Sequence, residues 1–281
     1  MISGVCDAAS CDYYAVMGNP IAHSKSPLIH QQFAAQTGER LVYEALLVKR
    51  DGFAQAVALF LIKGGKGLNV TVPFKQEAWE IADTLSDRAR RAGAVNTLLV
   101  DDDGALFGDN TDGVGLVRDL KQNLDFELKD RTLLLLGAGG AARGVLGPLL
   151  AEHPARVHIA NRTAARAVEL AESFADIDPV TGGGLDDIRL VHYDLIINAT
   201  AAGLEQQVPD LPGGLITPDT WCYDMMYGNE PTAFLRYARE RGSDHCFDGL
   251  GMLVEQAAES FRLWRGVMPE TAPVIAALRG N

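Results

Sequence analysis

The spacing of hydrophobic positions changes repeatedly along the chain, and this alternation of short apolar runs with helical patterns predicts an α/β fold. Strands are predicted at residues 14–17, 42–48, 68–72, 96–100, 105–108, 132–136, 156–160, 194–199, 221–224 and 243–247. Helices are predicted at residues 27–37, 52–63, 76–85, 113–123 and 250–266, with a last helix ending near Arg279. The Asp-Gly turn at residues 101–104 predicts a hairpin.

The pattern changes in character at Arg131. The run TLLLL at 132–136 is typical of a parallel strand buried on both faces. We therefore expect a doubly wound sheet in the second part of the chain, with a domain boundary near residue 111. Periodicity alone leaves open on which domain the final helices pack.

Composition narrows the function classes. The 281 residues carry a formal net charge of −12, which disfavours a nucleic-acid binder. No apolar run is long enough for a membrane span, and the N-terminus lacks the pattern of a signal peptide; we expect its first eleven residues to be poorly ordered. The four cysteines, at 6, 11, 222 and 246, have no metal or disulfide spacing, so reduced thiols in the cytoplasm are expected.

A cofactor site is predicted directly after the leucine strand. Residues 137–142, GAGGAA, match G-x-G-x-x-[GA] between a strand and a helix, which favours dinucleotide binding over a generic glycine-rich turn. The next strand ends at Asn161 without the carboxylate typical of NAD sites. Arg162, Thr163 and Arg166 follow instead and suit a 2′-phosphate. The alternative is that both arginines belong to a solvated helix face.

Lys75 is a candidate for general acid–base chemistry, and Asp112 is a candidate neighbour. Lys75 follows a strand at a helix start, where the helix dipole favours the neutral amine; the alternative is an ordinary surface lysine. Asp112, in GDNTDG, is either a helix N-cap or a partner of Lys75. Asn96 can read a hydroxyl or bond its own turn. His23 and His30 lack metal-ligand spacing and are expected to be structural.

The stretch GNPIAHSKSPLIH at 18–30 contains two serines before a helix. Ser26 before Pro27 is predicted to be the N-cap. Ser24 is then unexplained by capping, and we expect both hydroxyls to grip a carboxylate.

Seven motifs occur in order, and together they resemble shikimate dehydrogenase of the NADP-dependent bacterial type. They are SKSP at 24–27, NVTVPFK at 69–75, AGAVNT at 92–97, GDNTDG at 108–113, GAGGAA at 137–142, NRT at 161–163 and DGLGMLVEQA at 248–257. The resemblance covers about residues 13–280. It implies a substrate domain at 1–111 and 249–281, to which the C-terminal helices return, and a Rossmann-type NADP domain at 112–248.

The resemblance also implies the chemistry: reversible reduction of 3-dehydroshikimate to shikimate by NADPH, in chorismate and aromatic amino acid biosynthesis. Lys75 and Asp112 would form the catalytic pair. The implied substrate contacts are Ser24, Ser26, Asn69, Thr71, Asn96, Tyr227 and Gln256. The implied cofactor contacts are Gly137, Ala138, Gly139, Gly140, Ala141, Asn161, Arg162, Thr163, Arg166, Thr200, Met225 and Gly249. No metal, membrane or nucleic acid is implied, and the enzyme would be a cytoplasmic monomer or homodimer.

The chain departs from the family at Ala201, where the family often has Ser or Pro, and in its extra N-terminal residues. Two rival functions are an NAD-dependent quinate/shikimate dehydrogenase and a non-catalytic NADP sensor. Arg162 disfavours the first, because an acidic residue usually stands there. The presence of both Lys75 and Asp112 disfavours the second.

Overall fold

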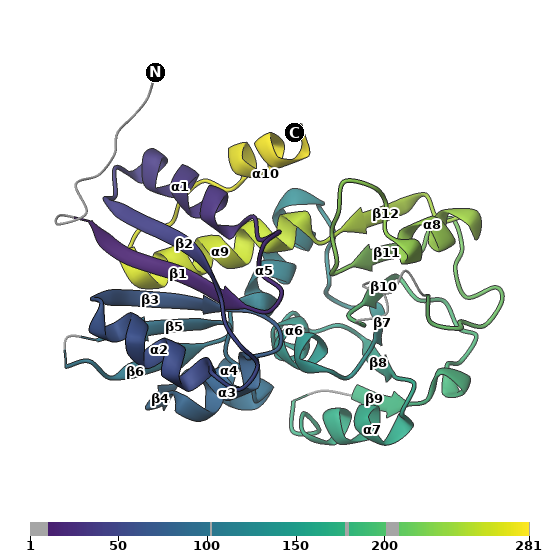
Figure 1. The fold of residues 1–281 in the computed structure, drawn as a ribbon. Helices are drawn as coiled ribbons and strands as arrows, with labels where there is room; N and C mark the ends of the chain where they lie inside the picture. The colour runs from purple at the N-terminus through teal and green to yellow at the C-terminus, as the bar shows by residue number, and fades with distance from the viewer. Residues whose placement is uncertain (1–10, 102, 178–179, 201–207, 281) are drawn as a thin grey trace. The chain divides into compact units, whose positions relative to one another are not determined.

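The computed structural model describes residues 11–101, 103–177, 180–200 and 208–280. The expectations for residues 1–10 and for Ala201 lie outside this range. The chain divides into two compact units: unit 1 comprises Met1–Gly115 and Val254–Asn281, and unit 2 comprises Leu116–Leu253. Each unit is built around its own six-stranded sheet (Figure 1). The predicted α/β class is confirmed.

The sheet of unit 1 is mixed, with strand order β2-β1-β3-β5-β6-β4. The strands β1, β2 and β3 are parallel, whereas β5 is antiparallel to both β3 and β6. The strands are β1 (Asp12–Gly18), β2 (Leu41–Leu47), β3 (Gly65–Val70), β4 (Thr84–Leu85), β5 (Thr97–Val100) and β6 (Leu106–Asp109). The helices of this part of the chain are α1 (Ser26–Thr37), α2 (Phe53–Ile62), α3 (Lys75–Ile81), α4 (Asp87–Ala92) and α5 (Asp112–Arg118), which runs into unit 2 from Leu116 onward.

The C-terminal helices are α9 (Leu250–Arg265) and α10 (Ala272–Arg279), and most of α9 and all of α10 belong to unit 1. Trp264 of α9 anchors this return, because its indole nitrogen donates to the Leu98 carbonyl at 3.0 Å and its ring stacks on Tyr14. Gly67 on β3 makes room for that ring: a Cβ there would lie 2.4 Å from the indole nitrogen. The expected return of the C-terminus to the first domain is confirmed.

The sheet of unit 2 is entirely parallel, with strand order β12-β11-β10-β7-β8-β9. Its strands are β7 (Thr132–Leu136), β8 (Arg156–Ala160), β9 (Val180–Gly183), β10 (Leu195–Asn198), β11 (Trp221–Asp224) and β12 (His245–Asp248). Its helical segments are η2 (Asp119–Asn123), one turn of π-helix after α5, then α6 (Gly140–Leu150), α7 (Ala164–Glu172), the short 3₁₀ turn η3 (Leu185–Asp187) and α8 (Ala233–Glu240).

The leucine run of β7 is buried on both faces, as its composition predicts. Leu133 and Leu135 contribute to one apolar cluster, and Leu134 and Leu136 to another. Because successive side chains of a strand point to opposite faces, the two clusters lie on opposite sides of the sheet. Burial on both faces of this strand is what a doubly wound sheet, covered on both sides, requires.

Several predicted boundaries are wrong. The helix predicted over 76–85 ends at Ile81, and residues 84–92 form β4 and α4 instead. Strand β9 was not predicted, because its sequence VTGG is short and glycine-rich. The helix predicted over 113–123 begins one residue earlier and changes to a π-turn at Asp119.

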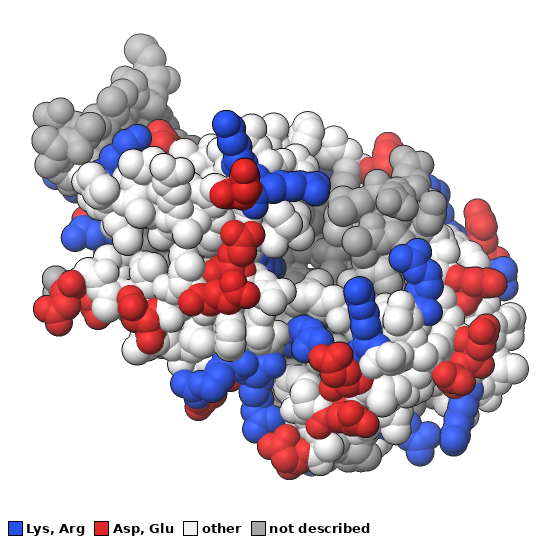
Figure 2. Space-filling model, turned by 60° about the horizontal axis from the view of Figure 1, so that its bottom comes forward, with Lys and Arg blue, Asp and Glu red and all other residues white. Residues whose placement is uncertain are grey.

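The thiols also differ from expectation. Cys222 and Cys246 are free, but Cys11 is disulfide-bonded, so the expectation of reduced thiols is wrong for Cys11. In the part of the chain that the structure describes, no helix combines the length and apolar character needed to cross a membrane. Acidic and basic side chains are interspersed on the face shown in Figure 2.

Candidate active site

Lys75 and Asp112 form an ion pair in unit 1. The Lys75 ammonium donates to Asp112 Oδ2 at 2.5 Å, although the two residues are 37 positions apart in sequence. Lys75 is the first residue of α3 and Asp112 the first of α5, so the two helix starts meet. The lysine side chain retains 21% exposure and the aspartate 9%. The surface-lysine alternative is therefore wrong, and the pair can exchange a proton with a bound group.

Asn96 holds the other oxygen of that carboxylate. Its amide nitrogen donates to Asp112 Oδ1 at 2.8 Å, and its amide oxygen accepts from the Thr111 N–H at 2.9 Å. Gln256 of α9 also approaches, with its Oε1 3.3 Å from the Asn96 amide nitrogen. Asn96 is thus more than a turn amide, because it fixes the orientation of Asp112 toward Lys75.

The buried carboxylate of Asp109 anchors the loop that carries Asp112. Arg88 binds Asp109 through two hydrogen bonds, at 2.7 and 2.5 Å, and Ser86 donates to the same carboxylate at 2.5 Å. Arg88 also reaches Glu259 on α9 at 3.2 Å. A bidentate pair of this kind fixes geometry as well as energy. Asp109 is therefore an anchor of the loop rather than a simple turn residue.

The Asn69 amide makes several hydrogen bonds within unit 1, so it is not free to bind a ligand. Its amide nitrogen donates to Asn96 O, Thr97 Oγ1 and Ser260 Oγ, at 3.2, 3.1 and 3.0 Å. Its amide oxygen accepts from the Tyr43 hydroxyl at 2.7 Å. The sequence analysis missed Tyr43 and Ser260, because neither lies in a recognisable motif. Thr71 differs from Asn69, since its hydroxyl makes no hydrogen bond to another described residue and can face a ligand.

Ser24, and not Ser26, makes the capping contact at the start of α1. Ser26 is the first residue of the helix, and Lys25 stands at the N-cap without a side-chain cap. Ser24 Oγ accepts from the Ser26 N–H at 3.3 Å, so Ser24 makes the local capping contact. Ser26 is buried beside the Tyr43 hydroxyl. The prediction that Ser26 is the N-cap is wrong.

His30 is fully buried one turn into α1. Its ring stacks on Tyr43 with centroids 4.2 Å apart, among Phe33, Phe261 and Trp264. Burial lowers the pKa of His30 to about 3. Asn69 is a neighbour, yet neither ring nitrogen makes a hydrogen bond of good geometry to a described residue. Among the described residues no three or more His, Cys, Asp or Glu are grouped to hold a metal ion.

The glycine-rich turn lies in unit 2 between β7 and α6. Gly137 has φ +108°, and a Cβ there would lie 3.1 Å from the Ala199 carbonyl oxygen, so glycine is needed for both reasons. Gly139 is the N-cap of α6 and offers no side-chain cap. The first amide N–H groups of α6 therefore remain available to an anion such as a pyrophosphate.

Two arginines, Arg162 and Arg166, follow the end of β8. Asn161 folds back so that its amide nitrogen donates to the Thr163 carbonyl at 2.9 Å, just before α7. Arg162, Thr163 and Arg166 are exposed, and within the described residues neither guanidinium has an ion-pair partner. Exposed cations after the second strand can bind a 2′-phosphate.

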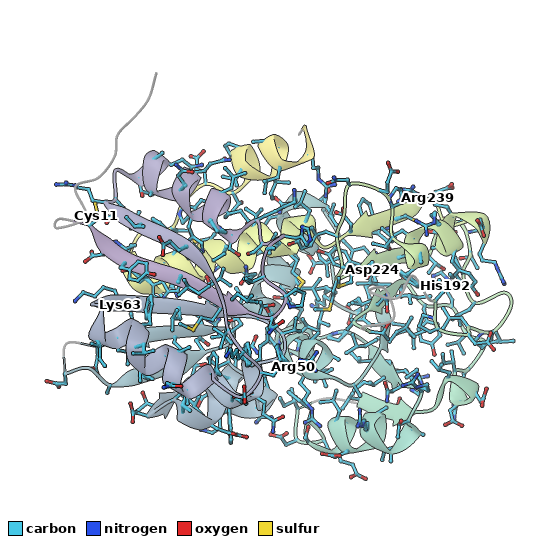
Figure 3. All side chains as sticks on the ribbon, in the orientation of Figure 1. Cys11, Arg50, Lys63, His192, Asp224 and Arg239 are labelled. Atoms are coloured by element: carbon cyan, nitrogen blue, oxygen red, sulfur yellow. The ribbon has the colours of Figure 1, made fainter. Side chains whose placement is uncertain are left out.

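Two loops meet at the ends of β11 and β12. A Cβ on Gly249 would lie 2.3 Å from the Met225 carbonyl oxygen, so Gly249 allows the two backbones to approach closely. Asp224, at the end of β11 (Figure 3), accepts from Thr232 at 2.5 Å and from Asn198 at 3.2 Å. Asn198 Oδ1 in turn accepts from Thr200. Burial raises the pKa of Asp224. The sequence analysis missed Asp224, whose position at a strand end was a usable signal.

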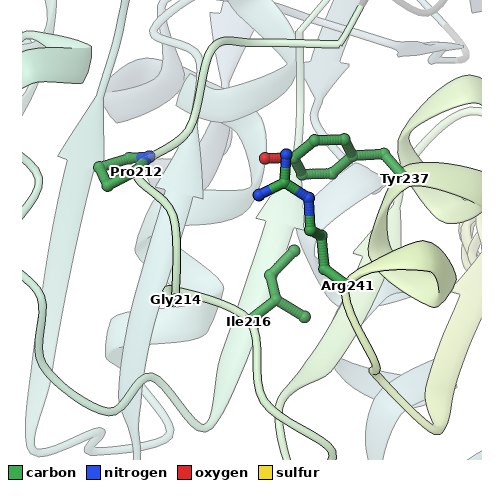
Figure 4. Close-up of a pocket in the computed structure, with 5 residues that line it drawn as sticks. All are labelled: Pro212, Gly214, Ile216, Tyr237 and Arg241. Atoms are coloured by element: carbon green, nitrogen blue, oxygen red, sulfur yellow. The ribbon is translucent and has the colours of Figure 1, made fainter.

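Tyr227 lies in unit 2, three residues after β11, and burial raises the pKa of its hydroxyl. Figure 4 shows a separate pocket of unit 2, lined by Pro212, Gly214, Ile216, Tyr237 and Arg241. The Arg241 guanidinium covers the Tyr237 ring at 4.6 Å. The pocket has a volume of about 90 Å³, which holds a few water molecules but no dinucleotide.

Three family models match the chain. They describe a shikimate dehydrogenase substrate-binding domain (residues 16–98), a shikimate/quinate 5-dehydrogenase (residues 119–205) and a shikimate 5′-dehydrogenase C-terminal domain (residues 249–279). The shikimate dehydrogenase (NADP(+)) of Thioalkalivibrio sulfidiphilus is 60% identical over 268 residues, covering 95% of this chain and 98% of the relative.

Solved structures agree with these matches. An Ael1 enzyme from Pseudomonas putida superposes with a TM-score of 0.90 at 44% identity, covering 95% of this chain and 98% of the other. Shikimate 5-dehydrogenase from Thermus thermophilus, solved with NADP(H) and shikimate, gives a TM-score of 0.84 at 36% identity, covering 96% of this chain and 99% of the other. Together with the Lys75–Asp112 pair and the glycine-rich turn, these likenesses establish that the chain belongs to the shikimate dehydrogenase family.

Proposed function

We propose that this protein catalyses the reversible, NADPH-dependent reduction of 3-dehydroshikimate to shikimate, in chorismate and aromatic amino acid biosynthesis. The observation that carries the proposal is the Lys75–Asp112 pair, at 2.5 Å, with Asn96 on its second carboxylate oxygen. A family member that only bound the cofactor would need neither residue. High identity to a relative that carries this activity supports the assignment.

Lys75 is the proton donor of the reduction. As hydride reaches the carbonyl carbon, negative charge develops on the carbonyl oxygen, and the ammonium supplies the proton that neutralises it. In the reverse direction the neutral amine takes the proton from the alcohol. Asp112 holds the ammonium in place and also accepts from a substrate hydroxyl. The second role is compatible with its 9% side-chain exposure, which leaves part of the carboxylate accessible.

The substrate carboxylate and hydroxyls are bound by residues around this pair. Ser24 and Ser26 receive the carboxylate beside the first turn of α1, together with Tyr227 of unit 2. The Thr71 hydroxyl, Asn96 and Gln256 receive hydroxyls of the ring. For Asn69 we now propose a positioning role, because all of its donors are taken by Asn96, Thr97 and Ser260.

Unit 2 has the features needed to hold NADPH, which supplies the hydride. The turn residues Gly137, Ala138, Gly139, Gly140 and Ala141 present the open N-terminus of α6 to the pyrophosphate. Arg162, Thr163 and Arg166 bind the 2′-phosphate, and Asn161 shapes that loop. Thr200, Met225 and Gly249 line the nicotinamide side.

The test is the rate of NADP⁺ reduction by the purified protein with shikimate, measured beside NAD⁺ and quinate. We expect the highest kcat/KM with shikimate and NADP⁺. Preference for NAD⁺ would refute the role of Arg162 and Arg166, and preference for quinate would refute the substrate. We place the enzyme in the cytoplasm as a monomer or homodimer, which sedimentation of the purified protein distinguishes.

A further inference from the structure

Cys222 and Cys246 lie side by side on neighbouring strands of unit 2. The register of β11 and β12 pairs the two residues directly, and both strands are parallel. Neighbouring strands are about 4.8 Å apart, which falls within the Cα separation that a disulfide can bridge. The Cys222 thiol contacts the Thr220 carbonyl at 4.0 Å, and the Cys246 thiol contacts the Ser243 carbonyl at 3.8 Å. The reaction that the family catalyses uses neither of them.

The two thiols have different surroundings. Cys222 is fully buried in the apolar cluster between the sheet and α8. Cys246 lies on the edge strand β12 and is partly exposed, with the Ser243 hydroxyl 3.6 Å from its sulfur. Arg239 lies on α8, the helix that covers this edge (Figures 1 and 3), and its charge acts on Cys246. The neighbouring Cys222 thiol, aided by Ser243 and Arg239, lowers the pKa of Cys246 to about 6, whereas Cys246 and burial raise the pKa of Cys222.

We propose that Cys246 and Cys222 form a peroxide-sensitive dithiol, in which Cys246 is the reacting thiol and Cys222 the resolving thiol. The Cys246 thiolate attacks one oxygen of hydrogen peroxide, the O–O bond breaks, and a sulfenic acid and hydroxide form. The Cys222 thiol then loses its proton to hydroxide and attacks the Cys246 sulfur. The S–O bond breaks, the hydroxide that leaves takes up the proton that Cys246 lost when it became a thiolate, and the disulfide forms. In total two thiols and one peroxide give one disulfide and two waters.

The bond would act on the loops that follow both strands. A disulfide brings the two Cβ atoms to about 3.8 Å, closer than neighbouring strands place them, so β11 and β12 must shift. Three residues further on, Met225 and Gly249 already pack so tightly that no Cβ fits between them. Gly249 also donates to the Met226 carbonyl at 3.1 Å, which couples the two loops. Strain of this kind makes a disulfide readily reducible, as reversible control requires.

The expected effect on the reaction rests on the proposed function, because it assumes that Met225 and Gly249 contact the nicotinamide. A shift of about 1 Å in those loops lowers kcat/KM for NADPH by on the order of tenfold to a hundredfold. The formation of the bond does not rest on that function. Peptide mapping therefore tests the bond, and kinetics test its effect.

The experiment treats the full-length protein with hydrogen peroxide, blocks the remaining thiols by alkylation and maps the peptides by mass spectrometry. We expect a peptide pair joined through Cys222 and Cys246, which dithiothreitol releases. In Cys222→Ala we expect a Cys246 sulfenic acid that dimedone traps. Cys11→Ser is the matched control and should still form the bond, since Cys11 is already disulfide-bonded.

Two outcomes would overturn the proposal: alkylation of both thiols after peroxide treatment, or oxidation of Cys246 to sulfinic acid while Cys222 stays alkylatable in the wild type. Kinetics on the same samples should show the fall in kcat/KM for NADPH and its recovery with dithiothreitol. In Cys246→Ser the fall should be absent. A joined peptide pair in a protein that never turns over shikimate would uphold the dithiol and refute the proposed function alone.

Discussion

The proposed catalytic region of unit 1 and the proposed cofactor region of unit 2 are built in opposite ways. In unit 1, Lys75, Asp112 and Asn96 are already joined to one another by short hydrogen bonds. In unit 2, Arg162 and Arg166 are exposed and have no ion-pair partner among the described residues. One region is preassembled by its own side chains, and the other leaves its charged groups open.

This difference matches the proposed role of each region. A proton donor needs a fixed position when charge develops on the carbonyl oxygen. Contacts within the protein therefore hold it in that position before the substrate binds. A phosphate site must exchange its ligand in every turnover, and exposed guanidinium groups attract an anion without holding it permanently. We therefore expect changes at the Lys75–Asp112 pair to lower kcat and changes at Arg162 or Arg166 to raise the KM for the cofactor.

The largest effect is expected for Lys75→Ala. Loss of the proton donor should lower kcat by about 10²- to 10⁴-fold, the usual contribution of general acid catalysis. The KM for shikimate should change little, because Lys75 acts on the transition state. Steady-state kinetics with saturating NADP⁺ measure both constants. Lys63→Ala, at an exposed position after α2, is the control and should retain wild-type turnover. Near-normal kcat in Lys75→Ala would contradict the assignment of the donor.

A smaller effect, on binding rather than on turnover, is expected for Arg162→Ala. One charge-assisted hydrogen bond contributes about 1.5–3 kcal/mol, so the KM for NADPH should rise by about 10- to 100-fold. The KM for NADH should hardly change, because NADH has no 2′-phosphate. The same kinetics at two salt concentrations should show a weaker salt dependence in the variant. Arg189→Ala, exposed in the same unit, serves as control. Equal losses with both cofactors would place Arg162 outside the phosphate site.

The two regions also differ in how far their sequence predicts them. The cofactor turn is local: residues 132–142 contain the strand, the glycines and the helix start, and Gly137 has the positive φ that the motif requires. Arg162 lies two residues after the next strand, so its position could be predicted from the order of the elements alone. Gly137 is the exception, because it also packs against the distant Ala199 carbonyl.

The catalytic region depends on such contacts. Tyr43 reaches Asn69 across 26 positions, and Ser260 reaches it across 191. No spacing rule predicts these pairs, because they arise only when β2, β3 and α9 come together. The Ser26 error has the same cause: the preference for serine before proline predicted a cap, but burial beside Tyr43 made Ser26 the first helical residue. The motifs identified candidate residues in unit 1, but packing determines the hydrogen-bond partners of each one.

His30 offers a way to test how tightly unit 1 is preassembled. Its pKa is lowered to about 3 in the folded protein, from about 6.5 when unfolded, so the unfolded chain binds the proton more readily. Above pH 6.5 His30 is neutral in both the folded and the unfolded protein, so its titration does not lower the free energy of unfolding. Below this pH, stability falls by at most about 1.4 kcal/mol per pH unit until the folded protein itself takes the proton.

His30→Phe keeps an aromatic ring against Tyr43 and removes the titrating group. We expect its free energy of unfolding to fall less steeply than that of the wild type between pH 6.5 and about 4. Urea denaturation at several pH values measures the slope, and His23→Gln, at an exposed histidine, should keep the wild-type slope. Parallel curves for His30→Phe and the wild type would mean that His30 is not held neutral by burial.

The smallest effect, and the most discriminating, is expected at Ser24. Its oxygen already accepts from the Ser26 N–H, at a long 3.3 Å, while its own O–H has no acceptor among the described residues. The first contact predicts a stability loss below about 1 kcal/mol on Ser24→Ala. The unused donor predicts a rise in the KM for shikimate of about three- to tenfold, the equivalent of one hydrogen bond. Ser26→Ala should cost more stability, since Ser26 is buried against Tyr43. If Ser24→Ala lost stability with an unchanged KM, the serine would only shape the turn and would take no part in substrate binding.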